Sequence, residues 1–219
     1  MNLYQNLEQA TAADRKALLS SPVILAAMTG RVDRSHYLDF LSRAFHHVRH
    51  TVPLLMACGA RLSSEHEWLR NDVAHYIQEE IGHHEWILND ITAAGGDADA
   101  VRASQPDFDT DIMIGYAYNT VTRNNPVAMF GMVYVLEGTS VSLASQAATT
   151  LRNALGLPAS AFTYLSSHGS LDVEHIGDLE RLVNRLSDKA DHDSVVRSAK
   201  IFFRLYGNVL RGIDLGVAA

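Results

Sequence analysis

The stretch PVAMFGMVYVLEGTSVSLASQAATTLRN, residues 126–153, decides the fold class of this chain. Pro126 suits the first turn of a helix, and apolar side chains then recur every three or four residues, the period of an α-helix with one buried face. That face reads Phe130, Val133 or Tyr134, Glu137, Val141, Ala144 and Ala148. Glu137 is alone there among apolar neighbours, and a buried carboxylate is costly unless it is paired, neutralised or bound to a metal.

Helical periodicity continues outward from this stretch over almost the whole sequence, whereas alternating strand-like segments are short and rare. The chain has 219 residues, of which 47% are hydrophobic, and its composition does not change along its length. We therefore expect an all-α fold, a helical bundle in a single domain that spans residues 1–219.

A second helix combines a carboxylate and an imidazole on its apolar face. The capping-box pattern of Ser64 and Glu67 predicts its start, and Gly95 predicts that it runs without interruption to Ala94. Its expected buried face reads Leu69, Val73, Tyr76, Glu80, His83 and Ile87. Residues 97–109 are expected to form a polar loop after it.

A third helix is expected within residues 160–187. One face of it turns from polar to apolar along its length and reads His168, Asp172, His175, Leu179, Leu182 and Leu186. Offsets of four and seven residues return to one helix face, so two imidazoles and one carboxylate should point the same way. Either Asp191 or Asp193 is expected to cap the final helix.

The three helices together supply three carboxylates and three imidazoles on faces expected to be buried. A lone buried Glu is more often protonated or salt-bridged, and a lone buried His is more often a satisfied core residue, so the set carries the prediction. The pairs Glu80/His83 and Asp172/His175 repeat the i, i+3 carboxylate–histidine pattern of helix-bundle diiron proteins. The sequence therefore predicts a metal site whose ligands are Glu80, His83, Glu137, His168, Asp172 and His175.

Neighbouring positions leave alternatives open. Glu79 could replace Glu80 as a ligand or orient an imidazole, and His84 could exchange roles with His83 by a small rotation of the helix. Tyr76 is most simply a core aromatic residue beside the metal.

The ligand types bear on the identity of the metal. Cys58 is the one cysteine, so iron–sulfur clusters and thiolate zinc sites are excluded. Mixed imidazole and carboxylate donors suit iron or manganese, although ligand type alone leaves zinc open. Six protein ligands suit two ions rather than one, and open positions on iron would accept dioxygen.

Charge and composition limit the partners. The net charge of −7 gives no basic surface for nucleic acid. The N-terminus lacks the features of a secretory signal, and no run of about 18 uncharged apolar residues is present. We expect a cytoplasmic protein without a membrane partner. Helical bundles of this size often dimerise through an apolar face, so a homodimer stays an open alternative.

The remaining histidines carry weaker signals. His46, His47 and His50 precede Pro53 and could form a second metal site, bind haem or contact a substrate. Solvent-facing or core-edge positions are the simpler interpretation for all three. His66 has no carboxylate at a matching core position.

Three motifs carry a resemblance to a known family: EEIGH at 79–83, YVLEGTS at 134–140 and HGSLDVEH at 168–175. On these motifs the chain resembles the haem-oxygenase-like diiron oxidases and oxygenases. The same fold group holds haem oxygenase, the TENA thiaminases and pyrroloquinoline quinone synthase. The likeness extends over most of the chain, from Ser21-Pro22-Val23 to the final helix.

The resemblance implies a haem-oxygenase-like helical bundle that binds two irons at its centre through the six residues named above. The chain differs from some members of the family at the first carboxylate ligand. Those members have it two or more helical turns before the histidine, where this chain has Val73 and Tyr76. The resemblance also implies that reduced iron activates dioxygen to oxidise a small organic substrate, with a separate electron donor as a further partner. Known members act on amino acids, fatty acids, aromatic amines and guanidines.

Two other functions remain as alternatives. One is a haem- or tetrapyrrole-binding protein of the same fold, although residues 1–30 contain no histidine to serve as the proximal ligand of a haem oxygenase. The other is a non-catalytic metal-binding helical protein. A thiaminase is disfavoured, because Cys58 lies outside the ligand-bearing segments and would have to supply its nucleophile.

Overall fold

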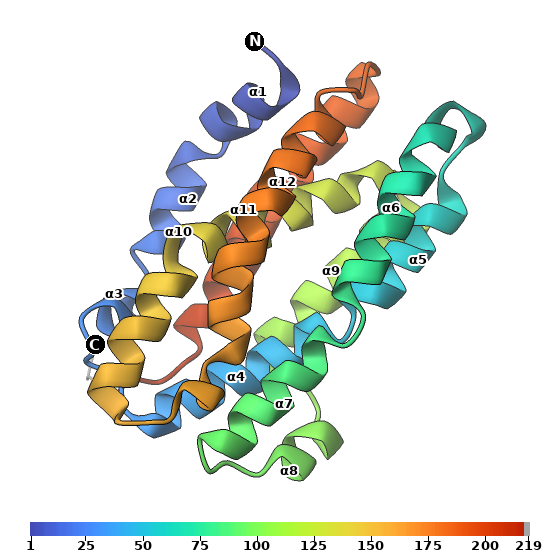
Figure 1. Ribbon diagram of the computed structural model, residues 1–219. Coiled ribbons are helices and arrows are strands. Elements are labelled where there is room, and N and C mark those ends of the chain that lie inside the picture. Colours follow the sequence, from blue (N-terminus) through green and yellow to red (C-terminus); the bar gives the residue numbers. More distant parts are fainter. Residues whose placement is uncertain (217–219) are drawn as a thin grey trace.

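The computed structural model describes residues 1–216, and the side chains of all of these except 168–175. The described residues form helices and connecting turns without a strand, as predicted (Figure 1). The α-helices are α1 Leu3–Ala10, α2 Ala12–Leu19, α3 Pro22–Met28, α4 Arg34–Val48, α5 Thr51–Arg61, α6 Glu67–Glu80, α7 His83–Ala93, α8 Ala98–Ala103, α9 Phe108–Arg123, α10 Met129–Leu155, α11 Thr163–Val183 and α12 Lys189–Arg211. Short 3-10 helices are η1 Ser64–His66, η2 Pro126–Ala128 and η3 Ala159–Ala161.

The helix α10 is the central element of the bundle. It begins after Pro126 and ends at Gly156, whose φ of +63° is a left-handed conformation that suits glycine. It packs most extensively against α11 and α12 and also against α3 (Figure 1). The segment Pro126–Leu155 is long and apolar enough to cross a membrane by length and composition, and 61% of its apolar window is buried inside the protein. A core helix of a helical bundle has these same properties.

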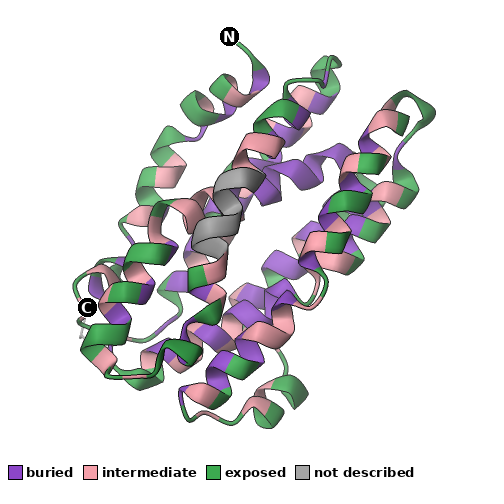
Figure 2. Ribbon diagram, viewed as in Figure 1, coloured by how far each residue is buried: buried purple, intermediate pink, exposed green. Residues whose placement is uncertain are grey.

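The buried apolar residues form two clusters that meet near the middle of α10. One cluster contains parts of α5, α6 and α12 with the half of α10 that ends at Val135. The other contains parts of α4 and α7 with the half of α10 from Ala144 onward. On α11 the boundary falls between Leu165 and Leu179. Glu137 lies at this boundary, and the inward faces of the helices around it are buried (Figure 2).

Three predicted boundaries are wrong. The predicted helix up to Ala94 is interrupted at Ile81 and Gly82, because Gly82 takes a left-handed conformation that a helix cannot include. The predicted loop at 97–109 contains α8, which Asp97 caps by accepting a hydrogen bond from the Ala100 amide. The final helix starts earlier than expected, with Asp188 as its cap.

Candidate metal centre

Glu80 and His83 face each other across the break between α6 and α7. Glu80 ends α6, His83 begins α7, and Gly82 between them has φ of +92°. Nδ1 of His83 lies 3.1 Å from Oε2 of Glu80, and the exposed fractions of the two side chains are 3% and 9%. The predicted burial of both residues is confirmed. The two groups therefore face each other across a turn at Ile81 and Gly82 and not along one continuous helical face.

Glu137 is buried in the middle of α10, with an exposed fraction of 8%. Glu137 and Glu80 line the same cavity, whose described wall contains no Lys or Arg. Two buried carboxylates at one cavity are costly unless they are protonated or a positive charge approaches them from elsewhere. A bound cation would meet that need.

The other three predicted ligands belong to α11. The side chains of His168, Asp172 and His175 lie outside the described residues. In the sequence of α11 they fall between Leu165 and Leu179, the interval in which the two apolar clusters meet. Among the side chains that the structure does describe, no three His, Cys, Asp or Glu residues form a group that could hold an ion. The described part of the centre is the Glu80/His83 pair together with Glu137.

Burial separates the predicted ligands from their alternatives. Glu79 is 32% exposed and lies 3.3 Å from Nε2 of His75. His84 is 36% exposed and lies 3.4 Å from Oε1 of Glu85. Tyr76 is buried and lines the cavity beside Glu80. The geometry therefore favours Glu80 over Glu79 and His83 over His84.

The described donors have the chemistry that iron accepts, because carboxylate oxygen and imidazole nitrogen without thiolate suit iron and manganese. Cys58 is completely buried outside the cavity, and its Sγ donates to the carbonyl of Pro126 at 3.3 Å. Burial raises the pKa of Cys58 to about 12. A thiol of this kind is neither a metal ligand nor a nucleophile at neutral pH.

The histidines of the α4–α5 region are buried or hydrogen-bonded, not solvent-facing. Nε2 of His46 lies 2.9 Å from Oγ of Ser104, and Nδ1 of His50 lies 3.0 Å from the hydroxyl of Tyr118. His47 is buried and lines the cavity. Of these three histidines, His47 is therefore the one placed to meet a ligand in the cavity.

His66 contacts the carboxylate of Asp191, a partner that was not predicted from the sequence. Its Nε2 lies 2.7 Å from Oδ2 of Asp191, which is buried in the first turn of α12. Asn125 donates to Oδ1 of the same carboxylate at 2.6 Å. This cluster joins η1, the cap of η2 and α12 away from the cavity, so it stabilises the fold and does not belong to the site.

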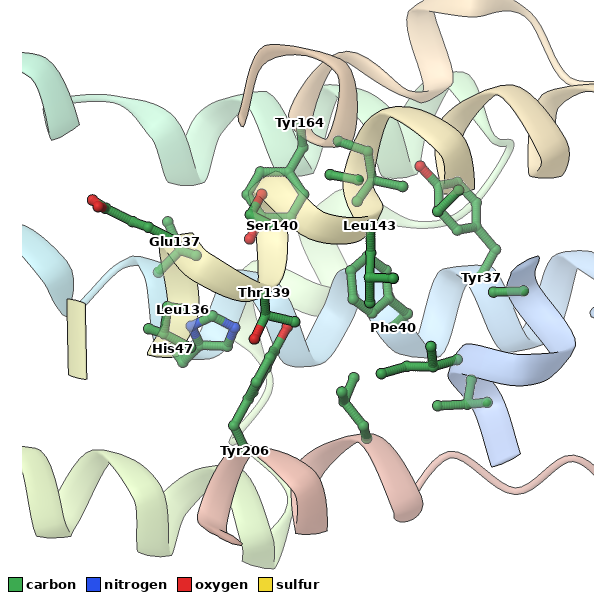
Figure 3. A pocket seen from close by; sticks show the side chains of 18 of the residues that line it. Tyr37, Phe40, His47, Leu136, Glu137, Thr139, Ser140, Leu143, Tyr164 and Tyr206 are labelled. Carbon is green, nitrogen blue, oxygen red and sulfur yellow. The ribbon is translucent and has the colours of Figure 1, made fainter. Parts of the chain in front are cut away.

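The cavity has a volume of about 170 Å³ and extends along α10 from the carboxylates toward α3. Five polar side chains surround its middle, and we call them the polar belt: His47, Thr139, Ser140, Tyr164 and Tyr206. They come from α4, α10, α11 and α12, and Figure 3 shows them between Glu137 on one side and Leu143, Phe40 and Tyr37 on the other. The part beyond the belt, which we call the apolar lobe, is lined mainly by aliphatic and aromatic side chains of α3, α4 and α10.

Among the belt residues, only His47 was considered from the sequence, as a possible metal or haem ligand or substrate contact. A signal for two of them exists in the run Glu137-Gly138-Thr139-Ser140, which interrupts an otherwise apolar helix. Tyr206 has the spacing of a core residue on α12, and His47 has that of a core-edge residue on α4. Only the packing of four helices shows that these side chains meet.

Comparison with known proteins agrees with the fold. A domain of unknown function with a heme oxygenase-like fold from Shewanella denitrificans OS217 aligns at 21% identity and a TM-score of 0.85, over 97% of this chain and 92% of that one. A TenA homologue from P. horikoshii OT3 aligns at 9% identity and 0.80, over 97% and 98%. Heme oxygenase-1 from the cyanobacterium Synechocystis sp. PCC6803, in complex with heme, aligns at 12% identity and 0.75, over 98% and 93%.

At such identities the structural likeness establishes the haem-oxygenase-like fold and no particular activity. No curated protein sequence matches the chain. The model of a family described as iron-containing redox enzymes matches residues 38–207, which is more than half of the chain. This range includes the Glu80/His83 pair, Glu137 and the polar belt. The chain therefore belongs to the family of iron-containing redox enzymes.

Proposed function

We propose that this protein is a non-haem iron oxidase or oxygenase that binds two iron ions and uses dioxygen to oxidise a small organic substrate. The iron ligands in this proposal are Glu80, His83, Glu137, His168, Asp172 and His175. Bound iron would supply open positions for dioxygen and electrons for its reduction. A separate donor would restore those electrons when the substrate does not provide them.

The observation that carries the proposal is the burial of Glu80 and Glu137 in the wall of one cavity that has no Lys or Arg in its described part, with His83 buried against Glu80. Oxygen and nitrogen donors without a thiolate match iron. The family membership supports the same metal.

The protein's own groups have separable tasks in this proposal. Glu80 and Glu137 would supply negative charge to the metal, and the contact of His83 with Glu80 fixes the orientation of the imidazole. The apolar walls of the cavity keep bulk water away from these groups, which strengthens electrostatic interactions there. The remaining cavity is the substrate site.

Iron analysis tests the proposal. Protein produced with added Fe(II) should contain iron, and the anaerobic reduced form should change its absorbance when dioxygen is admitted. Substoichiometric iron together with an unchanged spectrum would contradict an iron-dependent oxidase. Tight zinc binding without a dioxygen response would instead indicate the non-catalytic alternative.

A haem-binding function is the second candidate, and the position of His47 in the cavity wall is the observation that favours it. Haem titration should then produce a Soret shift that His47→Ala abolishes and His46→Ala retains, since His46 bonds Ser104 outside the cavity. A shift unaffected by His47→Ala, or no shift, would remove this candidate.

A further inference from the structure

Two hydroxyl groups of the polar belt are left for a ligand. Tyr206 packs edge-on against His47, with ring centroids 5.8 Å apart, and extends toward Thr139 in the cavity (Figure 3). Neither Tyr206 nor Ser140 forms a hydrogen bond within the described part of the chain, although both line the cavity. Both residues are only partly buried, so their hydroxyl groups are accessible from the cavity and can bond a polar group of a ligand that displaces water there.

The protonation state of Tyr206 determines whether its hydroxyl can donate a hydrogen bond to a ligand. Burial raises the pKa of Tyr206 to about 12, so its hydroxyl stays protonated at neutral pH and can donate. Thr139 already donates to the carbonyl of Val135 at 2.6 Å and so can only accept. Tyr206 therefore presents a donor, which suits an oxygen acceptor on the ligand.

The polar groups at the rim of the apolar lobe are, by contrast, already used by the protein. The Tyr37 hydroxyl donates to the carbonyl of Ala161 at 2.7 Å, and Nδ1 of His36 accepts from the backbone amide of Asp33 at 3.0 Å. The lobe therefore offers mainly apolar contact. Its wall on α10 extends from Leu143 to Leu151, a distance of about 12 Å at 1.5 Å per helical residue.

The side chains of the described cavity wall disfavour an anionic head group in the belt. Its described wall contains the carboxylates Glu80 and Glu137 and no Lys or Arg. An anionic head group in the belt would have no Lys or Arg of the described wall beside it, and burying an unpaired charge is costly. The volume of about 170 Å³ exceeds the ~150 Å³ of an apolar cavity that holds one benzene ring. Because the lobe extends over about 12 Å along α10, a molecule longer than one ring fits it.

We propose that the substrate class is an uncharged, unbranched aliphatic molecule with one oxygen function, such as an alcohol or an amide. Its oxygen accepts the hydrogen bond of Tyr206 and contacts Ser140, and its tail fills the apolar lobe. The oxygen-bearing end then lies next to Glu137, at the carboxylate end of the cavity. This inference deepens the proposed function and rests on it only in treating the cavity as the substrate site.

Calorimetric binding to metal-free, chelator-treated protein tests this inference separately from the iron proposal. Decanol and decanamide should bind saturably and more tightly than decanoate, decylamine or the shorter hexanol. Tyr206→Phe should weaken decanol binding about 2- to 10-fold, the usual effect of one neutral hydrogen bond, and Ser140→Ala should weaken it less. Tyr116→Phe and Ser145→Ala remove the same groups outside the cavity and should leave binding unchanged.

Filling the lobe tests the position of the tail. Leu143→Trp should abolish decanol binding, and Ala147→Phe gives a second, smaller obstruction should the first variant fail to fold. If decanoate or decylamine bound more tightly than decanol, the substrate class would not be uncharged. If Tyr206→Phe left the affinity for decanol unchanged, the belt would not be the site of its hydroxyl group. Absence of saturable binding by all four head groups would overturn the inference even if the protein binds iron and reacts with dioxygen.

Discussion

Nδ1 of His83 lies 3.1 Å from Oε2 of Glu80 although the two residues belong to different helices. In one continuous helix their spacing would place them on neighbouring turns of a common face. Here the left-handed Gly82 ends α6 and starts α7 in a new direction. The relative position of the two groups therefore depends on the backbone at one glycine.

Gly82→Ala should separate this backbone effect from chemistry. An added Cβ would meet no atom within 4 Å, so strain at φ of +92° is its direct effect. Placing alanine in a left-handed conformation costs about 1–2 kcal/mol. We expect a loss of stability of that size by urea denaturation, together with reduced iron content, because relaxation of the turn would move His83 away from Glu80.

Gly156→Ala is the matched control, because Gly156 also has positive φ, +63°, and open space around it. It should lose similar stability and keep its iron, since it lies at the far end of α10. Equal iron contents in the Gly82 and Gly156 variants would show that the turn at Gly82 does not position the site.

The limits of sequence-based prediction are visible at the same place. The buried face Leu69, Val73, Tyr76, Glu80, His83 and Ile87 was predicted by periodicity and is confirmed as buried. The break was not predicted, because the three-residue spacing of Glu80 and His83 fits a helix whether or not Gly82 interrupts it. Periodicity reports which residues face the core, whereas a single φ angle decides how two segments meet.

Single substitutions of neighbouring histidines should identify the ligand. His83→Ala should lower iron content severely, because the buried His83 contacts Glu80. His84→Ala should leave it unchanged, because His84 lies at the surface beside Glu85. Metal analysis of the two purified variants checks this. Iron loss in the His84 variant alone would exchange the two assignments.

The carboxylates allow the same comparison on α6. Glu80→Gln keeps the size of the side chain and removes its charge, so it should weaken iron binding while retaining the fold. Glu79→Gln should bind iron normally, since Glu79 faces His75 away from the cavity. If Glu79→Gln alone released the metal, the first carboxylate would be Glu79.

The polar belt is an example of the part of a functional site that sequence patterns do not predict. Glu137 stands out in the sequence because a charge interrupts an apolar face. Tyr206 does not stand out, because tyrosine is common on the core face of a helix. Whether its hydroxyl bonds a ligand depends on the residues around it. Those residues come from α4, α10 and α11. The meeting of these side chains arises from tertiary packing, which a local sequence pattern does not report.

The pH dependence of stability should reflect His46 and His50. Burial, aided by Arg49, lowers the pKa of each below its ordinary value of 6.5, and Asp107 and Asp111 oppose this only partly. Between the lowered pKa and 6.5 the unfolded chain binds more protons than the folded one. The free energy of unfolding should therefore decrease as the pH falls below about 6.5, and level off below the folded pKa values.

Urea denaturation on both sides of this pH range measures the effect. The double variant His46→Gln/His50→Gln should lose less stability on acidification than the wild type. His75→Gln removes an exposed histidine and should keep the wild-type response. An undiminished acid response in the double variant would assign the effect to other groups.

The buried carboxylate of Asp191 should stabilise the contact of α12 with η1 and the cap of η2. It accepts from Asn125 at 2.6 Å and lies 2.7 Å from Nε2 of His66, so Asp191→Ala would remove both interactions at once. We expect a loss of about 2–4 kcal/mol in urea denaturation, because hydrogen bonds to a buried charged group are among the stronger ones. Asp193→Ala removes an exposed carboxylate whose partner is Lys189, and it should change stability by less than about 0.5 kcal/mol. Iron content should stay normal in both variants, since neither residue lines the cavity, and equal stabilities would refute the role assigned to Asp191.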